Sequence, residues 1–557
     1  MARVFSINQF AGGMNDWLHP ALLSENTASL LVNADVSSGK IVPVNGRVEL
    51  GHNSPAYYGH YGTRNRSIVK WYERTYWSEN ATTTPPYYGG NEENFIGIPY
   101  PAYVVGGTVD LSGGTVGITG GTIDVSGGTV SVDVSGGTVT ITGGTLSDSV
   151  GGIAAIRSDD PAGSETGISG EYKYCVTFVS ANGWEGAPGS TESYEIPITL
   201  SNKAGVVAVV ATNPNITTAH IYRTIDHGAD FYQVGSVVLS GGTASKEAIF
   251  RDTVTDEDAQ LMNPLTSQAN YPPPNKGKFL CEFGGTFFLA VGDLLYFSVN
   301  GNPHAWPITQ FLSIGEEITG IVPEFQGVLV FTYNNVYRVT GAENPETVTK
   351  TYIPGNHGCR DFRTIDVLNN APVWLSNDGI CLWDGGSITI PSYRVKKTER
   401  LSVKYAVAAN DRYFLFLDDS SAIVYDVRNG GIFYTLGFTC DYAWYDGEND
   451  RMYMQILGGT SGSDKLYQYG NGDPTEFRYV TPAIDGGESA QKIFREFVTV
   501  CAGACNVSFS VDGESIGSVS LPAGRNRVKL PFRAVGRSMT LTVTGKSEFR
   551  ELAVIYD

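Results

Sequence analysis

A repeated two-residue pattern in the second half of the 557-residue chain constrains its fold more than any other feature. An aliphatic residue directly precedes an aromatic one in five apolar segments. The aromatic positions are Tyr296, Tyr337, Trp383, Tyr425 and Tyr467, spaced 41, 46, 42 and 42 residues apart. A period of this length holds about four short strands, the size of one β-propeller blade.

Each repeat also has a consistent internal order. An apolar segment comes first, a turn rich in Asn, Asp and Gly follows, and the aromatic-bearing strand comes next. Such turns join hairpin strands. We interpret the apolar segment as the first strand of its repeat and expect the five aromatic residues to occupy equivalent buried or half-buried positions. The alternative is an all-β meander with accidental spacing. The repeats lack a Gly-His/Trp-Asp signature, so they do not form a WD40 array.

An apolar hairpin pattern at residues 67–79 resembles one more blade. Together with the five repeats it predicts about six blades. The chain would then leave the propeller after Trp77 and return near Lys278, with the intervening residues inserted.

The first part of this insertion is a low-complexity array. Gly-Gly-Thr followed by an aliphatic residue recurs with a period of seven and one slip to nine. The triplets start at Gly106, Gly113, Gly120, Gly127, Gly136 and Gly143. Glycine corners between short aliphatic strands favour a small repeated β-layer or solenoid. The alternative is a flexible Gly/Ser/Thr linker.

The predicted domain boundaries follow these changes of pattern. We expect N-terminal strands and first propeller elements at 1–97, the Gly-Gly-Thr insertion at 98–160, a fibronectin type III-like β-sandwich at 161–270, propeller blades at 271–485 and a C-terminal β unit at 486–557. In the sandwich, alternation places Tyr172, Tyr174, Val176 and Phe178 on one face. In the C-terminal unit, Asp512-Gly513 predicts a hairpin turn.

Composition and charge narrow the function classes. The chain has 57 Asp and Glu against 38 Lys and Arg, a net charge of −19. This balance speaks against a protein that grips duplex DNA, which needs a basic face. No apolar run reaches the length of a membrane-spanning helix, and the first residues lack a secretory pattern. We therefore expect a protein made and kept in a cytoplasm until assembly.

No set of residues predicts chemistry. The seven cysteines are scattered, and we expect reduced, mostly buried thiols rather than a zinc site, although Cys501 and Cys505 could meet across a turn. The seven histidines show no metal spacing. Carboxylate pairs such as Asp418-Asp419 lie in turn-like stretches. We therefore predict no enzyme activity, no catalytic or metal residues and no cofactor.

The N-terminal residues resemble a known family. The matching features are Gly12-Gly13, Leu18 with Pro20, the stretch 24–26, Asn33-Ala-Asp-Val and the strand 39–43. Residues 10–47 are similar to the start of tail nozzle, or tail tubular, structural proteins of short-tailed bacteriophages. In that family this start precedes a β-propeller. The Gly-Gly-Thr array and the fibronectin-like module depart from the simplest members.

The resemblance implies a function and partners. It implies a homo-hexameric ring in the virion tail, assembled in the host cytoplasm. The ring would lie below the head-to-tail adaptor protein, contact tail fibre or spike proteins and let DNA pass without tight binding. An acidic lining that repels phosphate suits this role. Two alternatives stay open, a tail appendage that binds a receptor or glycan and a propeller glycosidase.

Overall fold

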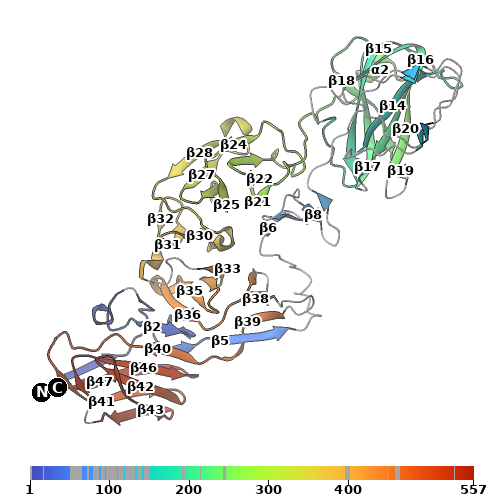
Figure 1. The fold of residues 1–557 in the computed structure, drawn as a ribbon. Coiled ribbons are helices and arrows are strands. Elements are labelled where there is room, and N and C mark those ends of the chain that lie inside the picture. Colours follow the sequence, from blue (N-terminus) through green and yellow to red (C-terminus); the bar gives the residue numbers. More distant parts are fainter. Residues whose placement is uncertain are drawn as a thin grey trace. The chain divides into compact units, whose positions relative to one another are not determined.

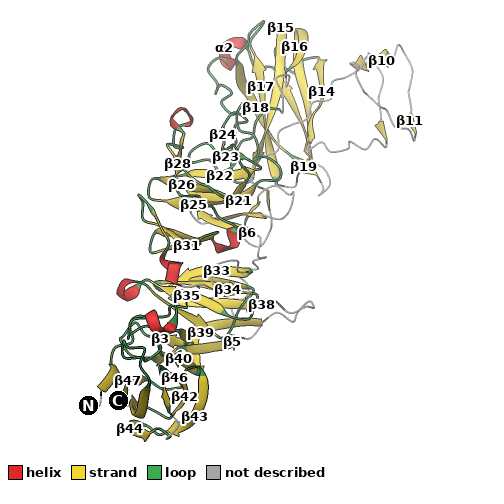
Figure 2. Cartoon of the chain, turned by 60° about the vertical axis from the view of Figure 1, so that its left-hand side comes forward, coloured by secondary structure: helices red, strands yellow, loops and turns green. Residues whose placement is uncertain are grey.

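The computed structural model describes most of the chain. The described residues are 3–16, 18–50, 66–71, 74–79, 87–89, 94–95, four dipeptide strands between 109 and 142, 151–189, 195–211, 213, 215–241, 246–394, 402–447, 449–457, 465–531 and 534–557. They are almost entirely strands and turns (Figure 2), which confirms the predicted all-β class. Their α-helix is a single turn, α2 (Asp256–Ala259). No described helix is long and apolar enough to cross a membrane.

The chain divides into two compact units. Unit 1 comprises Met1–Ser67, Gly292–Leu294 and Ile314–Asp557, and unit 2 comprises Ile68–Val291 and Leu295–Ser313. The four predicted boundaries between domains stay predictions, because these units group the chain by contacts rather than by those boundaries.

Unit 1 contains a series of four-stranded antiparallel arrays, which follow one another in Figure 1. The first array contains β25 (Ile318–Glu324), β26 (Gly327–Thr332), β27 (Val336–Thr340) and β28 (Thr349–Ile353), and the second contains β29 (Asp366–Leu368), β30 (Ala371–Ser376), β31 (Gly379–Trp383) and β32 (Ile388–Thr389). The third contains β33 (Val403–Ala409), β34 (Arg412–Leu417), β35 (Ala422–Asp426) and β36 (Ile432–Leu436). The fourth contains β37 (Tyr442–Asp446), β38 (Arg451–Ile456), β39 (Lys465–Pro474) and β5 (Asn45–Leu50).

The first strands of neighbouring arrays lie beside one another. β29 contacts β33, and β33 contacts β37. Two-residue turns with positive φ join first to second strands in two arrays, at Asn369-Asn370 (φ 51° and 64°) and Asn410-Asp411 (φ 51° and 61°). Asn and Asp tolerate this conformation, which matches the twist of a tight hairpin.

Two further four-stranded sheets have the same antiparallel plan. Their strands are β6 (Arg66–Trp71), β7 (Arg74–Glu79), β8 (Tyr87–Gly89) and β9 (Asn94–Phe95), and β21 (Lys278–Phe283), β22 (Thr286–Val291), β23 (Leu294–Phe297) and β24 (Phe311–Ser313). β7 contacts β21, where Ser78 Oγ accepts a hydrogen bond from the Leu280 amide at 3.0 Å. β21 begins at Lys278, and β8 and β9 continue the first sheet beyond Trp77. The return of the chain to a propeller at Lys278 stays a prediction.

A β-sandwich forms most of the remaining described part of unit 2. Its strands are β14 (Gly151–Asp159), β15 (Ile168–Ser180), β16 (Ile196–Ala211), β17 (Ile216–Thr224), β18 (Phe231–Val238), β19 (Ser240–Gly241) and β20 (Lys246–Asp252). The first half of β16 pairs with β15 and its second half with β14 and β20, so one long strand serves both sheets. β14 precedes the predicted start of the sandwich at 161. β14 begins with Gly151-Gly152, which continues the glycine pattern of the preceding array. The sequence therefore did not indicate a strand at this position.

The core of this sandwich contains a buried ion pair. Tyr172, Tyr174, Val176 and Phe178 are all buried, as the alternation predicts. Asp252 Oδ2 accepts hydrogen bonds from Tyr174 Oη at 2.5 Å and Arg223 Nη1 at 2.9 Å. Because a buried guanidinium needs partners for its N–H groups, this network satisfies a charge that would otherwise be costly.

A second sandwich lies at the C-terminus. Its strands are β40 (Phe477–Val480), β41 (Lys492–Cys501), β42 (Cys505–Val511), β43 (Glu514–Leu521), β44 (Gly524–Lys529), β45 (Val535–Gly536), β46 (Met539–Gly545) and β47 (Phe549–Tyr556). The order β47-β41-β44 forms one sheet and β40-β46-β42-β43 the other. The rings of Phe497 and Phe509 pack between them at 5.9 Å. The predicted Asp512-Gly513 turn is confirmed, with φ of 49° and 86°.

The N-terminal strands join this sandwich to the four-stranded arrays. β1 (Arg3–Ile7) pairs with β47, β2 (Leu30–Val32) pairs with both β36 and β40, and β5 pairs with β39. One nine-stranded sheet therefore runs from β33 through β2 to β43. The C-terminal sandwich thus includes β40 and strands from the other end of the chain, and the predicted start of a C-terminal unit at 486 stays a prediction.

The Gly-Gly-Thr segment is described only at four dipeptides. β10 (Val109–Asp110) pairs in parallel with β12 (Val132–Asp133), and β11 (Ile118–Thr119) pairs in parallel with β13 (Ile141–Thr142). The six predicted glycine corners, from Gly106 to Gly143, lie outside the described residues.

Candidate functional site

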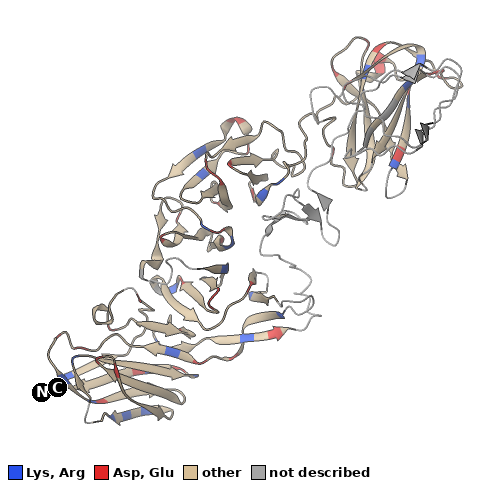
Figure 3. Ribbon diagram, in the orientation of Figure 1, with Lys and Arg blue, Asp and Glu red and all other residues tan. Residues whose placement is uncertain are grey.

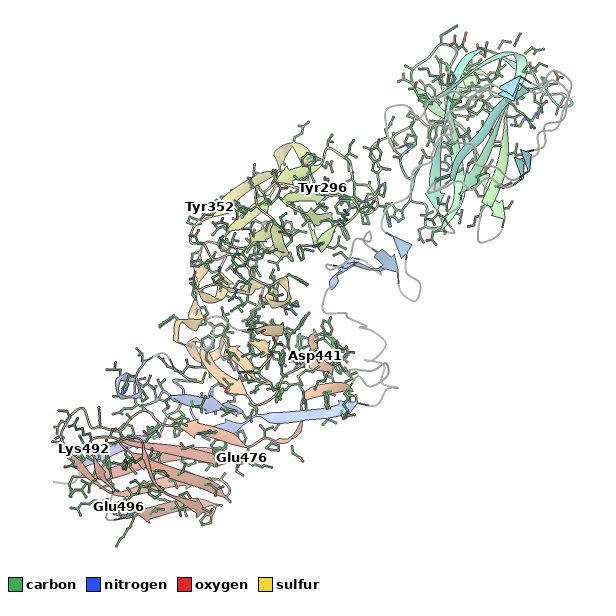
Figure 4. All side chains as sticks on the ribbon, viewed as in Figure 1. Tyr296, Tyr352, Asp441, Glu476, Lys492 and Glu496 are labelled. Carbon is green, nitrogen blue, oxygen red and sulfur yellow. The ribbon has the colours of Figure 1, made fainter. Side chains whose placement is uncertain are left out.

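The five repeat aromatics all lie in the third strand of a four-stranded array. Tyr296 is on β23, Tyr337 on β27, Trp383 on β31, Tyr425 on β35 and Tyr467 on β39. Trp383 and Tyr425 are buried, with 3% and 8% of their surface exposed, and the other three are half-buried (Tyr296 is labelled in Figure 4). The apolar segments that the sequence placed first in each repeat, beginning at Thr286 and Val328 among others, are second strands. The first strands, among them β25 and β33 with seven residues each, were not recognised as part of the repeat.

Trp383 connects two neighbouring arrays. Its ring packs in a core with Phe331 and Trp374, and its Nε1 donates to Glu324 Oε2 at 3.4 Å. The buried Glu324 carboxylate is neutralised by Arg338, whose Nε donates to Oε1 at 2.7 Å. The aromatic residue thus contributes both apolar burial and a polar contact between arrays.

The described residues hold no group of three or more His, Cys, Asp and Glu that could bind a metal ion. All seven cysteines are buried with free thiols, and Cys501 and Cys505 approach each other to 3.5 Å between sulfur atoms. Burial raises the pKa of Cys359 and Cys381 to about 12, so both thiols stay protonated and unreactive at neutral pH.

The segment that carries the family resemblance places several buried side chains at the junction of the arrays and the C-terminal sandwich, although Leu18 and Leu22 are exposed. Phe10 is fully buried and packs edge-on against Tyr479 and Phe549, at 5.2 and 5.9 Å between ring centroids. Gly13 has φ 65°, and a Cβ there would lie 2.9 Å from Ile432 Cβ. Glycine is required by both conformation and space.

Asn33 continues this junction. Its Oδ1 accepts from the Gly437 amide at 2.7 Å and its Nδ2 donates to the Glu476 carbonyl at 3.2 Å. Arg47 stacks over the rings of Phe438 and Tyr467, at 5.2 and 4.4 Å from their centroids. The motif residues thus hold elements together rather than present a reactive surface.

Asp35 anchors a charged cluster in the same region. Its Oδ2 accepts hydrogen bonds from Arg412 Nη2 at 2.6 Å and Arg428 Nη2 at 3.0 Å, and both arginines also pair with the buried Asp426. Burial by itself would raise the pKa of Asp35, but hydrogen bonds from Ser37 and the two arginine charges lower it below its ordinary value. Asp35 is therefore an ionised structural group.

A polar cleft opens beside this cluster, with a volume of about 600 Å³. Its wall is formed by β3 (Ala34–Asp35), β4 (Val42–Pro43), Asn45, the turn at Asn410, the residues 449–452 and the irregular part of β39 from Gln468 to Asn471. The volume lies in the range of ligand-binding sites. No local sequence pattern predicts the cleft, since its residues come from four separate segments.

A basic edge strand is the other exposed feature. β44 pairs with β41 at one margin of the C-terminal sheet and carries Arg525, Arg527 and Lys529 at alternate positions (Figure 3). Arg527 Nε donates to Glu496 Oε2 on β41 at 2.8 Å (Glu496 is labelled in Figure 4). Arg525 and Lys529 form no ion pair within the described residues, so this edge offers positive charge in an acidic chain.

Comparison with known sequences gives no family. No protein-family model matches the chain, and no curated protein matches it.

Solved structures give weak similarities. The mitotic checkpoint complex matches at 8% identity and a TM-score of 0.26, covering 61% of this chain and 98% of that chain. A WD40 β-propeller domain of Doa1 matches at 8% and 0.25 (61% and 89% covered), and YCF48 bound to D1 peptide at 12% and 0.25 (45% and 75% covered). These TM-scores are too low to establish a shared fold or function.

Proposed function

We propose that the chain is a structural component of a short-tailed phage tail. It forms a homo-oligomeric ring below the head-to-tail adaptor and guides DNA during ejection. The observation that carries this proposal is the placement of residues 10–47, whose sequence resembles the nozzle family. Their strands pair with β36, β39 and β40, and β1 just before them pairs with β47. Residues 10–47 therefore have a structural role, because they hold strands from distant parts of the chain together.

The arrays support a six-bladed propeller as the body of the protein. The proposed blades are β6–β9, β21–β24, β25–β28, β29–β32, β33–β36 and β37–β39 with β5. In the last of these, the outer strand comes from the N-terminal segment and the other three from residues 442–474. Sharing strands from distant parts of the chain within one blade is a physical way to close a propeller ring, whose blades keep only short, protected edges.

Charge supports a channel that does not hold DNA. The net charge is −19, and the basic residues of β44 are confined to one edge strand. An acidic surface raises the free energy of phosphate close to it, so DNA would slide rather than bind.

Among the other functions considered, a glycosidase gains no support from the cleft. A glycosidase needs one carboxylic acid that keeps its proton near neutral pH. Of the two cleft carboxylates, Asp35 has a lowered pKa and is held by two arginines, and Asp450 Oδ1 lies 2.6 Å from the Tyr445 hydroxyl.

Fluorescence anisotropy with a labelled DNA duplex tests the proposal. At about 0.15 M salt the protein should show no binding up to about 10 µM, because its net charge of −19 repels phosphate. Micromolar affinity that falls steeply with salt would contradict it. A double variant, Arg525→Glu with Lys529→Glu, separates the two interpretations. If binding occurs and the variant abolishes it, β44 is a DNA-binding edge.

A further inference from the structure

The polar cleft contains hydrogen-bonding side chains that the fold leaves unused. The half-buried Gln468 amide and the exposed Arg451 guanidinium form no side-chain hydrogen bond or ion pair within the described part of the chain. Arg412 uses Nε and Nη2 on Asp426 and Asp35, and its Nη1 has no partner among the described residues. The N–H donors of Gln468, Arg451 and Arg412 Nη1 in the wall of the cleft therefore have no hydrogen-bond acceptor among the described residues.

Acceptors are present at the same place. Asn45 donates through Nδ2 to the Gly470 carbonyl at 3.2 Å, which leaves its own side-chain oxygen available. Asn410 Oδ1 and Asp450 Oδ1 lie 2.8 and 2.6 Å from the Tyr445 hydroxyl, and each oxygen has a second lone pair. The cleft can thus donate and accept hydrogen bonds around a single ligand.

The charged side chains in the wall of the cleft favour a neutral ligand. The wall includes two carboxylates, Asp35 and Asp450, and two guanidinium groups, Arg412 and Arg451. The two carboxylates would repel an anion, and the two guanidinium groups would repel a metal cation. A neutral molecule rich in hydroxyl groups meets both, since each hydroxyl donates and accepts one or more hydrogen bonds.

We propose that the polar cleft between the β33–β34 and β37–β38 turns, bounded by Asn45 and Gln468, binds a neutral saccharide. Saccharide binding in this cleft does not depend on the DNA-conduit role. Recognition depends on amide and guanidinium groups converging on sugar hydroxyls, with Arg412 fixed in place by Asp35 and Asp426.

Saturation-transfer NMR and calorimetry on the full chain test this inference. The probes are glucose, galactose, N-acetylglucosamine and maltose, with inorganic phosphate and calcium as charged controls. At least one sugar should bind saturably, with a Kd below about 10 mM, as expected for a small open polar site. Gln468→Ala and Arg451→Ala should each weaken binding about ten-fold. Arg525→Ala, a matched change of an exposed unpaired arginine on β44, should leave it unchanged.

Each other outcome overturns the proposal. Absence of binding by every sugar up to about 50 mM means that the cleft holds only water. Sugar binding that neither cleft variant weakens places the ligand elsewhere. Phosphate binding that Arg451→Ala abolishes, without sugar binding, identifies an anion site. Thermal unfolding of all three variants within a few degrees of the parent protein verifies that each result reports on the cleft.

Discussion

Asp35 Oδ2 accepts a hydrogen bond from Arg412 Nη2 at 2.6 Å, although the two residues are 377 positions apart in the chain. The contact connects the N-terminal segment to β34, and Arg428 reinforces it from the end of β35. Both side chains are about four-fifths buried, with 18% and 20% of the arginine and carboxylate surface exposed. Distant parts of the chain are therefore held by a shielded ionic contact.

Replacing Asp35 tests the strength of this contact. Asp35→Asn should reduce the free energy of unfolding by about 1–3 kcal/mol, because two arginines would then share Asp426 alone. Urea denaturation measures the change. Glu49→Gln is the control, since the Glu49–Lys465 pair is about half exposed and should contribute nothing measurable. Equal effects of both changes would show that Asp35 has no special role.

The same contact has a defined pH dependence. The pKa of Asp35 is lower in the folded than in the unfolded chain, so its contribution is complete above the unfolded pKa. It is lost as the pH falls through the folded pKa. The stability difference between the parent protein and Asp35→Asn should therefore shrink as the medium becomes more acidic. A difference that grows instead would mean that the carboxylate is not stabilised in its ionised form.

Trp383 tests the equivalence of the repeat aromatics. Trp383→Ala should reduce stability by about 3–5 kcal/mol, because it leaves a cavity beside Phe331 and Trp374 and removes the partner of Glu324. Chemical denaturation monitored by circular dichroism gives the value. Tyr393→Ala, at a residue that is 62% exposed, is the control and should change stability little. A small effect of Trp383→Ala would remove the basis for treating these positions as core sites.

The contribution of Asp366 to the stability of the protein should be larger in acid, whereas most carboxylates stabilise less as the pH falls. Burial raises its pKa from 3.8 to about 6, although the amides of Ala408 and Val367 donate to it. The folded state thus binds the proton more tightly, and this group's contribution falls by about 3 kcal/mol as pH rises from about 4 to 6, then stays constant. Thermal melts of Asp366→Asn should lack this component. Asp384→Asn is the control, because turn amides lower its pKa and its contribution has the opposite sign.

Local patterns predicted much of the fold. Alternation identified β15, the Asp512-Gly513 pair identified a hairpin, and the recurring aromatics marked the third strands of five arrays. These signals need only a few neighbouring residues, because strand periodicity and turn conformation are local properties.

Long-range pairing was not predictable in this way. Nothing in the sequence around Leu30 indicates that β2 pairs with both β36 and β40, or that Asn45 lies beside Gly470. The first strands of the arrays were also missed. β29, for example, has only three residues and begins with the half-buried Asp366. Its role follows from contacts with β33 that no single segment encodes.

Electron microscopy of the purified full-length protein tests the central claim most directly. The account predicts closed, hollow rings with rotational symmetry, in which each subunit contributes one propeller and the centre is open to a DNA duplex. Double substitution Arg525→Glu with Lys529→Glu should reduce their number if the β44 edge meets an acidic neighbour. Particles that stay single subunits at every concentration, or assemblies without a central opening, would contradict the account.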